Sequence, residues 1–197
     1  MALRVPKAQL TGLTGALVKR MSRKRFGEVP EPVEVMWHHR GLVKTSVWLT
    51  NKIEKLDAVD ANLKSFAHIA VAAKLGCSWC IDFSYFKAHN QSLDLSKASQ
   101  VPRWRESEVF TPLERDVLEY AEAMTATPPT VTDELAKRLL GRLGPAAMVE
   151  LTSYIAFANF GGRTNVALGI ESQGYSSVCE IPAAARPEKV AASALSS

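Results

Sequence analysis

Long apolar runs are missing from this chain of 197 residues, and their absence excludes a membrane-spanning helix. Charged residues interrupt every hydrophobic stretch well before the roughly 18 residues that a span requires. The short apolar piece from Leu10 to Val18 precedes its basic cluster, whereas a signal peptide places its positive charge first. We therefore expect no membrane partner, no export signal and a cytoplasmic protein.

Cysteine is scarce as well, with residues at Cys77, Cys80 and Cys179. Three cysteines are too few for a small secreted scaffold held by disulfides. A composition of 47% hydrophobic and 22% charged residues is typical of one globular core. Cys179 lies beside a small, polar tail, where it could form a mixed or intersubunit disulfide or be an incidental surface thiol.

Acidic residues are absent from the first 25 positions, which hold seven bases. The rest of the chain has 17 bases against 20 acids and is slightly acidic. A basic segment can bind nucleic acid, but this one lacks the interleaved aromatic residues of such surfaces. We expect a solvated arm and no nucleic-acid partner. The predicted organisation is a basic N-terminal arm (1–28), one all-helical domain (29–178) and a disordered tail (179–197).

Strand patterns of period two do not persist beyond a few residues, so the sequence predicts an all-α fold. Asp60 and Gly76 delimit the clearest helix, and Thr111 with Glu114 forms a capping box at the start of another. Polar Asn159, Arg163 and Asn165 interrupt an apolar helix, which predicts hydrogen bonds across a helix or subunit contact. The further expected helices are 31–55 with a break near Gly41, one starting at the cysteine pair, 94–100, one starting at Thr132, and 146–170 with a kink at Gly161–Gly162.

The pair Cys77 and Cys80, in a Cys-x-x-Cys spacing at a helix start, has three physical interpretations. A helix N-terminus stabilises a thiolate, and two sulfurs at this spacing can close a disulfide, which favours redox chemistry. A metal site needs more ligands, but no second such pair exists and the four histidines are scattered. We expect no metal and no cofactor. The third interpretation, two small buried residues where helices meet, stays open.

Three passages are similar to one known family. Residues 66–83 (FAHIAVAAKLGCSWCIDF) resemble the core motif of the carboxymuconolactone decarboxylase family, which includes alkyl hydroperoxidase D-like proteins. Residues 110–115 (FTPLER) and 159–171 (NFGGRTNVALGIE) resemble its later helices, so the resemblance covers about residues 33–175. It implies a compact multi-helix all-α fold and a homo-oligomer, a trimer or a hexamer. It also implies a thiol peroxidase acting on an organic hydroperoxide or another small apolar substrate, with a dithiol reductant as partner.

The resemblance implies catalytic roles for individual residues. In the peroxidase members the second cysteine attacks and the first resolves, so Cys80 and Cys77 take those roles. Those members carry a glutamate and a histidine as a proton relay at positions that are Ser65 and Ser84 here. Neither serine is an acid or base near neutral pH without help. His68 lies one turn after Ser65 on the same helix face, and we expect it to replace the relay.

Two questions stay open at this point. Helix-end electrostatics favour Cys77 as the reactive thiolate, against the family's preference for Cys80. Asp82, two residues after Cys80, points about 200° away on an ideal helix and is a poor candidate for the relay. The alternatives to a peroxidase are a non-redox lactone decarboxylase or isomerase in the same pocket, and a redox-responsive binding protein without turnover. His38 and His39 could line the pocket or serve helix packing.

Overall fold

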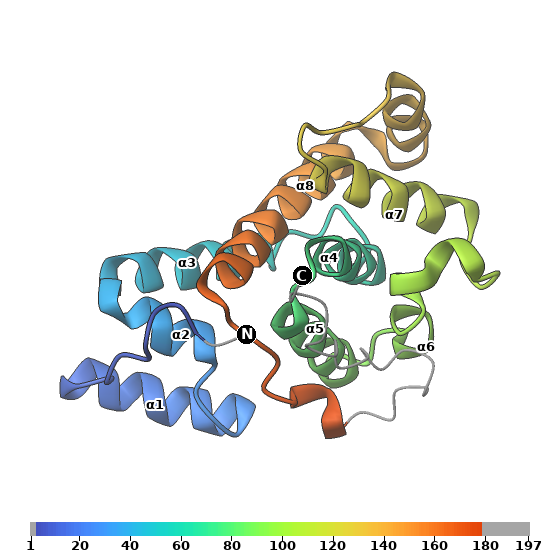
Figure 1. Cartoon of the computed structure of the whole chain (residues 1–197). Helices are drawn as coiled ribbons and strands as arrows, with labels where there is room; N and C mark the ends of the chain where they lie inside the picture. The colour runs from blue at the N-terminus through green and yellow to red at the C-terminus, as the bar shows by residue number, and fades with distance from the viewer. Residues whose placement is uncertain (1–2, 179–197) are drawn as a thin grey trace, which may run out of the picture.

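Helix α4 (Ala61–Leu75) lies at the centre of the molecule, with α5 (Ser78–Asn90), α7 (Pro112–Thr125) and α8 (Asp133–Leu168) packed around it (Figure 1). The structure is a computed structural model and describes residues 3–178. Within this range every regular element is a helix, which confirms the predicted all-α fold. The other elements are α1 (Gly12–Phe26), α2 (Glu31–Met36), α3 (Arg40–Ile53), α6 (Leu95–Ala98) and the 3₁₀ helices η1 (Trp37–His39), η2 (Val101–Glu106) and η3 (Tyr175–Val178).

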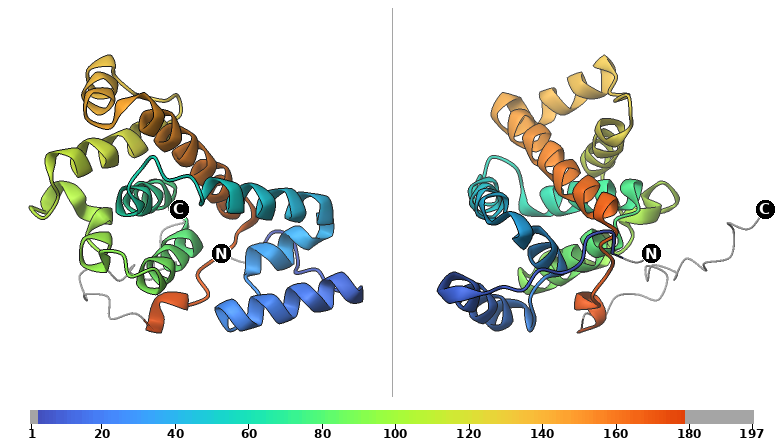
Figure 2. Two further views of the ribbon diagram at one scale, coloured as in Figure 1. Left: turned by 180° about the vertical axis from the view of Figure 1, so that it is seen from behind. Right: turned by 60° about the vertical axis from the view of Figure 1, so that its left-hand side comes forward.

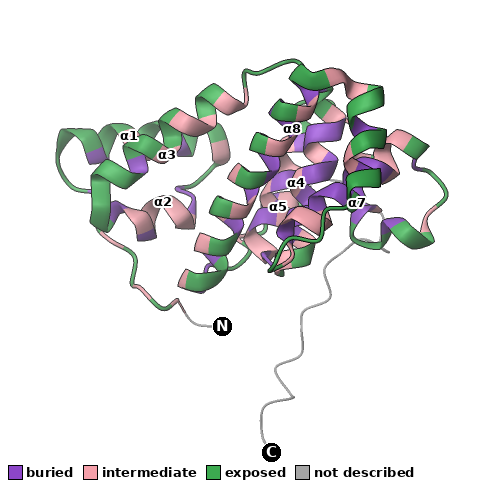
Figure 3. Ribbon diagram, turned by 90° about the horizontal axis from the view of Figure 1, so that it is seen from above, coloured by how far each residue is buried: buried purple, intermediate pink, exposed green. Residues whose placement is uncertain are grey.

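The ends of α4 are set by local signals in the sequence. The Asp60 carboxylate accepts hydrogen bonds from the backbone N–H groups of Asn62 and Leu63, at 2.8 and 3.3 Å. Gly76 ends the helix in the left-handed conformation, at φ 67°. A helix that is apolar on nearly all sides must be buried, and Figure 3 shows buried residues along α4. Both predicted ends are confirmed.

The main core joins α4 to the inner faces of α7 and α8. Its fully buried side chains include Phe66 and Ile69 from α4, Leu118 from α7, and Leu151 and Ile155 from α8. Burial of side chains of this size stabilises the fold by about 2 kcal/mol each. The core therefore packs α4 firmly against α8, the helix that also approaches the cysteine pair.

Helices α7 and α8 begin as the sequence predicts. Thr111 and Glu114 form the capping box, and Thr132 caps α8. Gly144, at φ 75°, makes a kink in α8 where the sequence predicts a new helix to start. The predicted kink at Gly161–Gly162 was wrong, since α8 continues in helical geometry to its cap at Gly169.

The N-terminal helices form a smaller layer on one side of the molecule (Figures 1 and 2). Residues 12–26, expected as a solvated arm, form α1, which carries the basic cluster. Leu10 and Val29 on either side of α1 are buried with Trp37 and Val43 in a second apolar cluster. The predicted break in the following helix falls at η1 rather than at Gly41, because the ring of His39 accepts the Leu42 N–H and starts α3 there.

Two further expectations concern the C-terminal tail and membrane-spanning helices. Cys179 and the predicted tail, 179–197, lie outside the described residues, so the roles weighed for this thiol stay predictions. Among residues 3–178, no helix combines the length and apolar character that crossing a membrane demands.

Candidate active site

Cys77 and Cys80 are joined in a disulfide at the junction of α4 and α5. Cys77 is the N-cap of α5, and its Sγ accepts the backbone N–H of Cys80 at 3.3 Å. Both residues are buried. The predicted meeting of two helices at the pair is confirmed, and the two sulfurs occupy the helix end at which a thiolate is stabilised.

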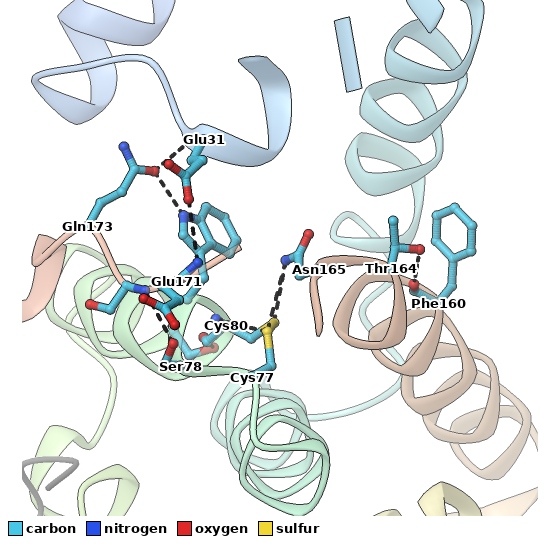
Figure 4. Close-up of a disulfide and its surroundings, with 12 residues drawn as sticks. Glu31, Cys77, Ser78, Cys80, Phe160, Thr164, Asn165, Glu171 and Gln173 are labelled. Carbon is cyan, nitrogen blue, oxygen red and sulfur yellow. Dashed lines mark hydrogen bonds between the residues drawn. A yellow bond between two sulfur atoms is a disulfide. The ribbon is translucent and has the colours of Figure 1, made fainter. Parts of the chain in front are cut away.

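Helix α8 supplies the other wall of the disulfide site. The side-chain amide of Asn165 donates to Cys80 Sγ at 3.5 Å and to Cys77 Sγ at 4.0 Å (Figure 4). Gly162, one turn earlier, allows the close approach, since a Cβ there would stand 2.7 Å from Leu75 Cδ1 and 4.0 Å from Cys80 Sγ. The sequence predicted a hydrogen bond from Asn165 across a helix contact, but the sulfurs as its partners were missed.

A segment after α8, residues 171–176, crosses the start of α5; we name it the strap. The Asp82 carboxylate accepts hydrogen bonds from the backbone N–H groups of Gly174, Tyr175 and Ser176 at 2.7 to 3.0 Å, and from the Ser172 hydroxyl at 2.8 Å. Burial alone raises the pKa of the Asp82 carboxyl, but these hydrogen bonds outweigh it and hold that pKa below its ordinary value. Asp82 therefore faces away from the sulfurs, as predicted, and serves to anchor the strap.

The strap also reaches the two residues between the cysteines. The Trp79 indole N–H donates to the Gln173 side chain at 3.0 Å, and the Ser172 backbone N–H donates to Ser78 Oγ at 3.2 Å. The ring of Tyr175 meets that of Trp79 edge to face. These contacts fix the strap against the segment that carries the disulfide.

A cavity of about 100 Å³ opens between α4 and α5. Ser65 and Ser84, which stand where the peroxidase relay would be, both line it together with His68. Ser84 also donates its hydroxyl to the carbonyl oxygen of Cys80 at 2.6 Å. The structure thus brings these three predicted positions together, whereas neither sulfur belongs to the cavity lining. The remaining lining residues are Glu54, Ala61, Lys64, Lys87, Gln91, Leu93 and Tyr154.

Burial keeps the His68 imidazole neutral near pH 7. Burial of the imidazole, together with the positive charge of Lys87, lowers the pKa of His68 to about 4. Lys87 pairs with Glu54 at 2.5 Å, and Glu54 also accepts the Tyr154 hydroxyl at 3.4 Å. The Tyr154 ring lies edge to face with His68, 6.1 Å between centroids. A neutral imidazole in such a cavity can accept and return a proton.

The other candidate residues have structural contacts. His38 bonds the carbonyl oxygen of Pro6, and His39 caps α3, so both serve helix packing rather than the cavity. Asn159 and Arg163 bond Thr125 across the contact of α8 with α7, as predicted. Within the described residues, no group of three or more histidine, cysteine or acidic side chains is placed to hold a metal ion.

Comparison with known proteins assigns the family. The carboxymuconolactone decarboxylase family matches residues 48–123. The uncharacterized protein YnjA of Escherichia coli (strain K12) is 36% identical over 168 residues, which cover 82% of this chain and 88% of the relative. The chain belongs to the carboxymuconolactone decarboxylase family, as its cysteine motif predicts.

Solved structures of lower identity share the fold. A cysteine-to-alanine variant of the debrominase Bmp8, in complex with 2,3,4-tribromopyrrole, superposes with a TM-score of 0.73 at 20% identity, covering 94% of this chain and 96% of that one. An alkylhydroperoxidase AhpD core, a peroxidase-related protein from Ralstonia eutropha JMP134, gives 0.71 at 14% identity, covering 87% and 94%. At these identities the likeness concerns the fold.

Proposed function

We propose that this protein is a thiol-dependent peroxidase that reduces organic hydroperoxides with Cys77 and Cys80. The observation that carries the proposal is the disulfide at the start of α5, one helical turn from a cavity that holds His68. Membership of a family with peroxidase-related relatives supports it.

The proposed reaction balances in three steps. The Cys80 thiolate attacks one oxygen of the hydroperoxide, the O–O bond breaks, and Cys80 becomes a sulfenic acid while the alkoxide takes up a proton to leave as an alcohol. The Cys77 thiol then attacks the sulfenic sulfur, forming the disulfide and releasing water. A dithiol partner supplies two electrons and two protons to restore both thiols and is itself oxidised to a disulfide.

His68 is the proposed proton carrier in the first step. Its imidazole is neutral near pH 7, and its ring can hydrogen-bond the attacked or departing oxygen; because its pKa is about 4 it is a weak base, so it holds the transferred proton only transiently. Ser84 and Ser65 provide hydroxyls in the same cavity that can hydrogen-bond the substrate, but neither replaces an acid or base.

Consumption of cumene hydroperoxide, with excess dithiothreitol or dihydrolipoamide, tests the proposal. Wild type is compared with Cys80→Ser and with Cys179→Ser, a matched control that removes a thiol outside the pair. We expect turnover in wild type and the control and none in Cys80→Ser. Absence of turnover in wild-type protein whose thiols still cycle would refute a peroxidase and leave a redox-responsive binding protein or another substrate.

The likeness to a debrominase favours a second reaction for the same cysteines. A thiol pair can reduce a carbon–bromine bond, since two thiols and one organobromide give a disulfide, the hydrogen-substituted product and bromide with a proton. Bromide release from a bromopyrrole under the same reducing conditions separates this reaction from peroxide reduction. The activity of a non-redox lactone decarboxylase or isomerase would instead be the same whether Cys77 and Cys80 are reduced or joined in the disulfide.

A homo-oligomer, a trimer or a hexamer, remains part of the proposal. Large apolar side chains are exposed on three helices, among them Leu13 on α1, Trp48 on α3 and Val149 on α8. Single exposed apolar side chains also occur on monomers, so the proposed oligomer rests on the family resemblance and these side chains are only compatible with it. Light scattering on a sizing column measures the mass, and a monomer at micromolar concentration would contradict this part of the proposal.

A further inference from the structure

We propose that the side-chain amide of Asn165 stabilises the thiolate of Cys80 and thereby makes Cys80, rather than Cys77, the attacking sulfur. Asn165 acts through the cysteine and is a positioning residue. The inference deepens the proposed function, because it concerns the same thiol pair. It also answers the conflict between the helix end, which favours Cys77, and the family resemblance, which favours Cys80.

The first argument is the placement of the amide. Asn165 is 6% exposed, and its Nδ2 lies 3.5 Å from Cys80 Sγ and 4.0 Å from Cys77 Sγ. A disulfide sulfur is a weak acceptor, so this buried donor gains little from the oxidised pair. The same donor facing a thiolate makes a charge-assisted hydrogen bond, which is about twice as strong as a neutral one. The contact therefore stabilises the reduced, ionised state most.

The second argument compares the donors that reach each sulfur. Cys77 Sγ receives the backbone N–H of Cys80 at 3.3 Å, as any N-cap side chain at this position would. Cys80 Sγ lies inside the first turn of α5 and is the sulfur nearer to the Asn165 amide. The Asn165 side chain thus gives Cys80 a hydrogen-bond donor that the second cysteine of a helix-capping pair does not ordinarily have.

The third argument is that the pair lies in a small cluster of apolar side chains. Ala72 comes from α4, Trp79 and Ile81 from α5, and Gly162 from α8. On α5 the acid closest in sequence, Asp82, is turned to the strap. On α8 the guanidinium of Arg163 bonds Thr125 and Thr127. In these apolar surroundings, the hydrogen bond from Asn165 is therefore expected to supply much of the stabilisation of a Cys80 thiolate.

Alkylation of the reduced protein tests the inference without any peroxide. In a Cys179→Ser background, iodoacetamide is added at a series of pH values, and mass spectrometry identifies which cysteine is modified and how fast. Asn165→Leu removes the donor at similar size, and Asn165→Gln keeps an amide. Asn159→Leu is the matched control, since Asn159 is an amide on the same helix that bonds Thr125 instead of sulfur.

We expect Cys80 to be alkylated first in wild type. Loss of one charge-assisted hydrogen bond in Asn165→Leu is expected to slow Cys80 about tenfold near neutral pH, to move its pH midpoint upward and to leave Cys77 the faster sulfur. Asn165→Gln is expected to recover part of the rate, and Asn159→Leu all of it. An unchanged rate and order in folded Asn165→Leu would overturn the inference.

Circular dichroism checks that each variant is folded. If Asn165→Leu does not fold, Asn165→Asp, which has nearly the same shape, takes its place; its negative charge is expected to slow Cys80 further, and an unchanged rate would again overturn the inference. Because alkylation needs no hydroperoxide, a slow Asn165 variant in a protein without peroxide turnover would uphold this inference while refuting the proposed function.

Discussion

The hydroxyl of Ser84 donates a hydrogen bond to the carbonyl oxygen of Cys80 at 2.6 Å. Ser84 follows Cys80 by one helical turn, and the same serine lines the cavity that contains His68. The cysteine pair and the cavity are therefore adjacent along one face of α5. This adjacency lets a residue at position 84 influence chemistry at the sulfur.

Restoring an acid–base pair in this cavity is expected to raise peroxidase activity. The double variant Ser65→Glu/Ser84→His places a carboxylate and an imidazole where both serines already line the cavity. Positioned general acid–base groups commonly contribute about a hundredfold, so we expect kcat/KM for cumene hydroperoxide to rise at least tenfold. The control Ser84→Ala removes a hydroxyl without adding a base and should give no increase. A folded double variant with wild-type kinetics would contradict this role of the cavity.

Removal of His68 is expected to lower peroxide turnover with a characteristic pH dependence. Because burial and Lys87 hold the pKa of His68 at about 4, its protonation does not produce an inflection near pH 6.5 in the rate of wild type. His68→Ala should lose about a hundredfold in kcat/KM. His89→Ala, a variant of an exposed histidine on α5, is the matched control and should keep its rate. An unchanged kcat/KM in folded His68→Ala would refute the proton-carrier role.

The same imidazole should make stability depend on pH. The pKa of His68 lies at about 4 in the folded chain, below its ordinary 6.5, so the unfolded chain binds a proton between these values that the folded chain does not. This contribution is complete above the ordinary pKa and is lost as the pH falls toward 4. We expect the Tm of wild type to fall more steeply over this window than that of His68→Gln. Parallel curves would contradict the burial of a neutral His68.

Releasing the strap is expected to expose the residues between the cysteines. Asp82→Asn weakens the acceptor of three backbone N–H groups and should destabilise the protein by about 2 kcal/mol. The tryptophan fluorescence, to which Trp79 contributes as one of four tryptophans, should become more accessible to acrylamide, and dithiothreitol should reduce the disulfide faster. Because the pKa of Asp82 is lowered, acidification through that pKa should release the strap in wild type as well. Quenching and reduction rates equal to those of wild type would contradict the strap's covering role.

Neighbouring glycines on α8 are expected to respond in opposite directions. A Cβ at Gly161 meets nothing within 4 Å, so Gly161→Ala should stabilise the helix by about 1 kcal/mol. At Gly162 a larger side chain would press on Leu75 and approach Cys80 Sγ. Gly162→Val should cost about 2 kcal/mol by overpacking and should alter the reactivity of the disulfide. Equal effects on the unfolding free energy at both positions would contradict the close packing of α8 on the pair.

Local signals in the sequence are sufficient to predict where several of the helices begin and end. The cap at Asp60, the left-handed Gly76 and the capping box at Thr111 are interactions between residues a few positions apart, and each was predicted correctly. Helix α1 was not predicted, because the basic residues hide its pattern and its neighbour Leu10 is buried against Trp37 and Val43, far along the chain. Gly161 and Gly162 illustrate the same limit, since packing against α4 keeps α8 straight where composition suggests a kink.

The candidate site was predictable in its motif and not in its surroundings. The cysteine spacing and the position of His68 follow from neighbours on single helices. Contacts of Asn165 with the sulfurs, and of the strap with Asp82, join residues more than 80 positions apart. Such pairs form when helices pack, and no local pattern encodes them. The roles of Cys80, Cys77 and His68 in catalysis remain predictions.

The most direct test of the account is to trap the proposed sulfenic acid. In Cys77→Ser the resolving thiol is absent, so one equivalent of cumene hydroperoxide should leave Cys80 as a sulfenic acid that dimedone labels, as mass spectrometry would show. The account predicts a dimedone adduct on Cys80 in proportion to the hydroperoxide consumed. No adduct, with hydroperoxide left intact and Cys80 still open to iodoacetamide, would contradict it.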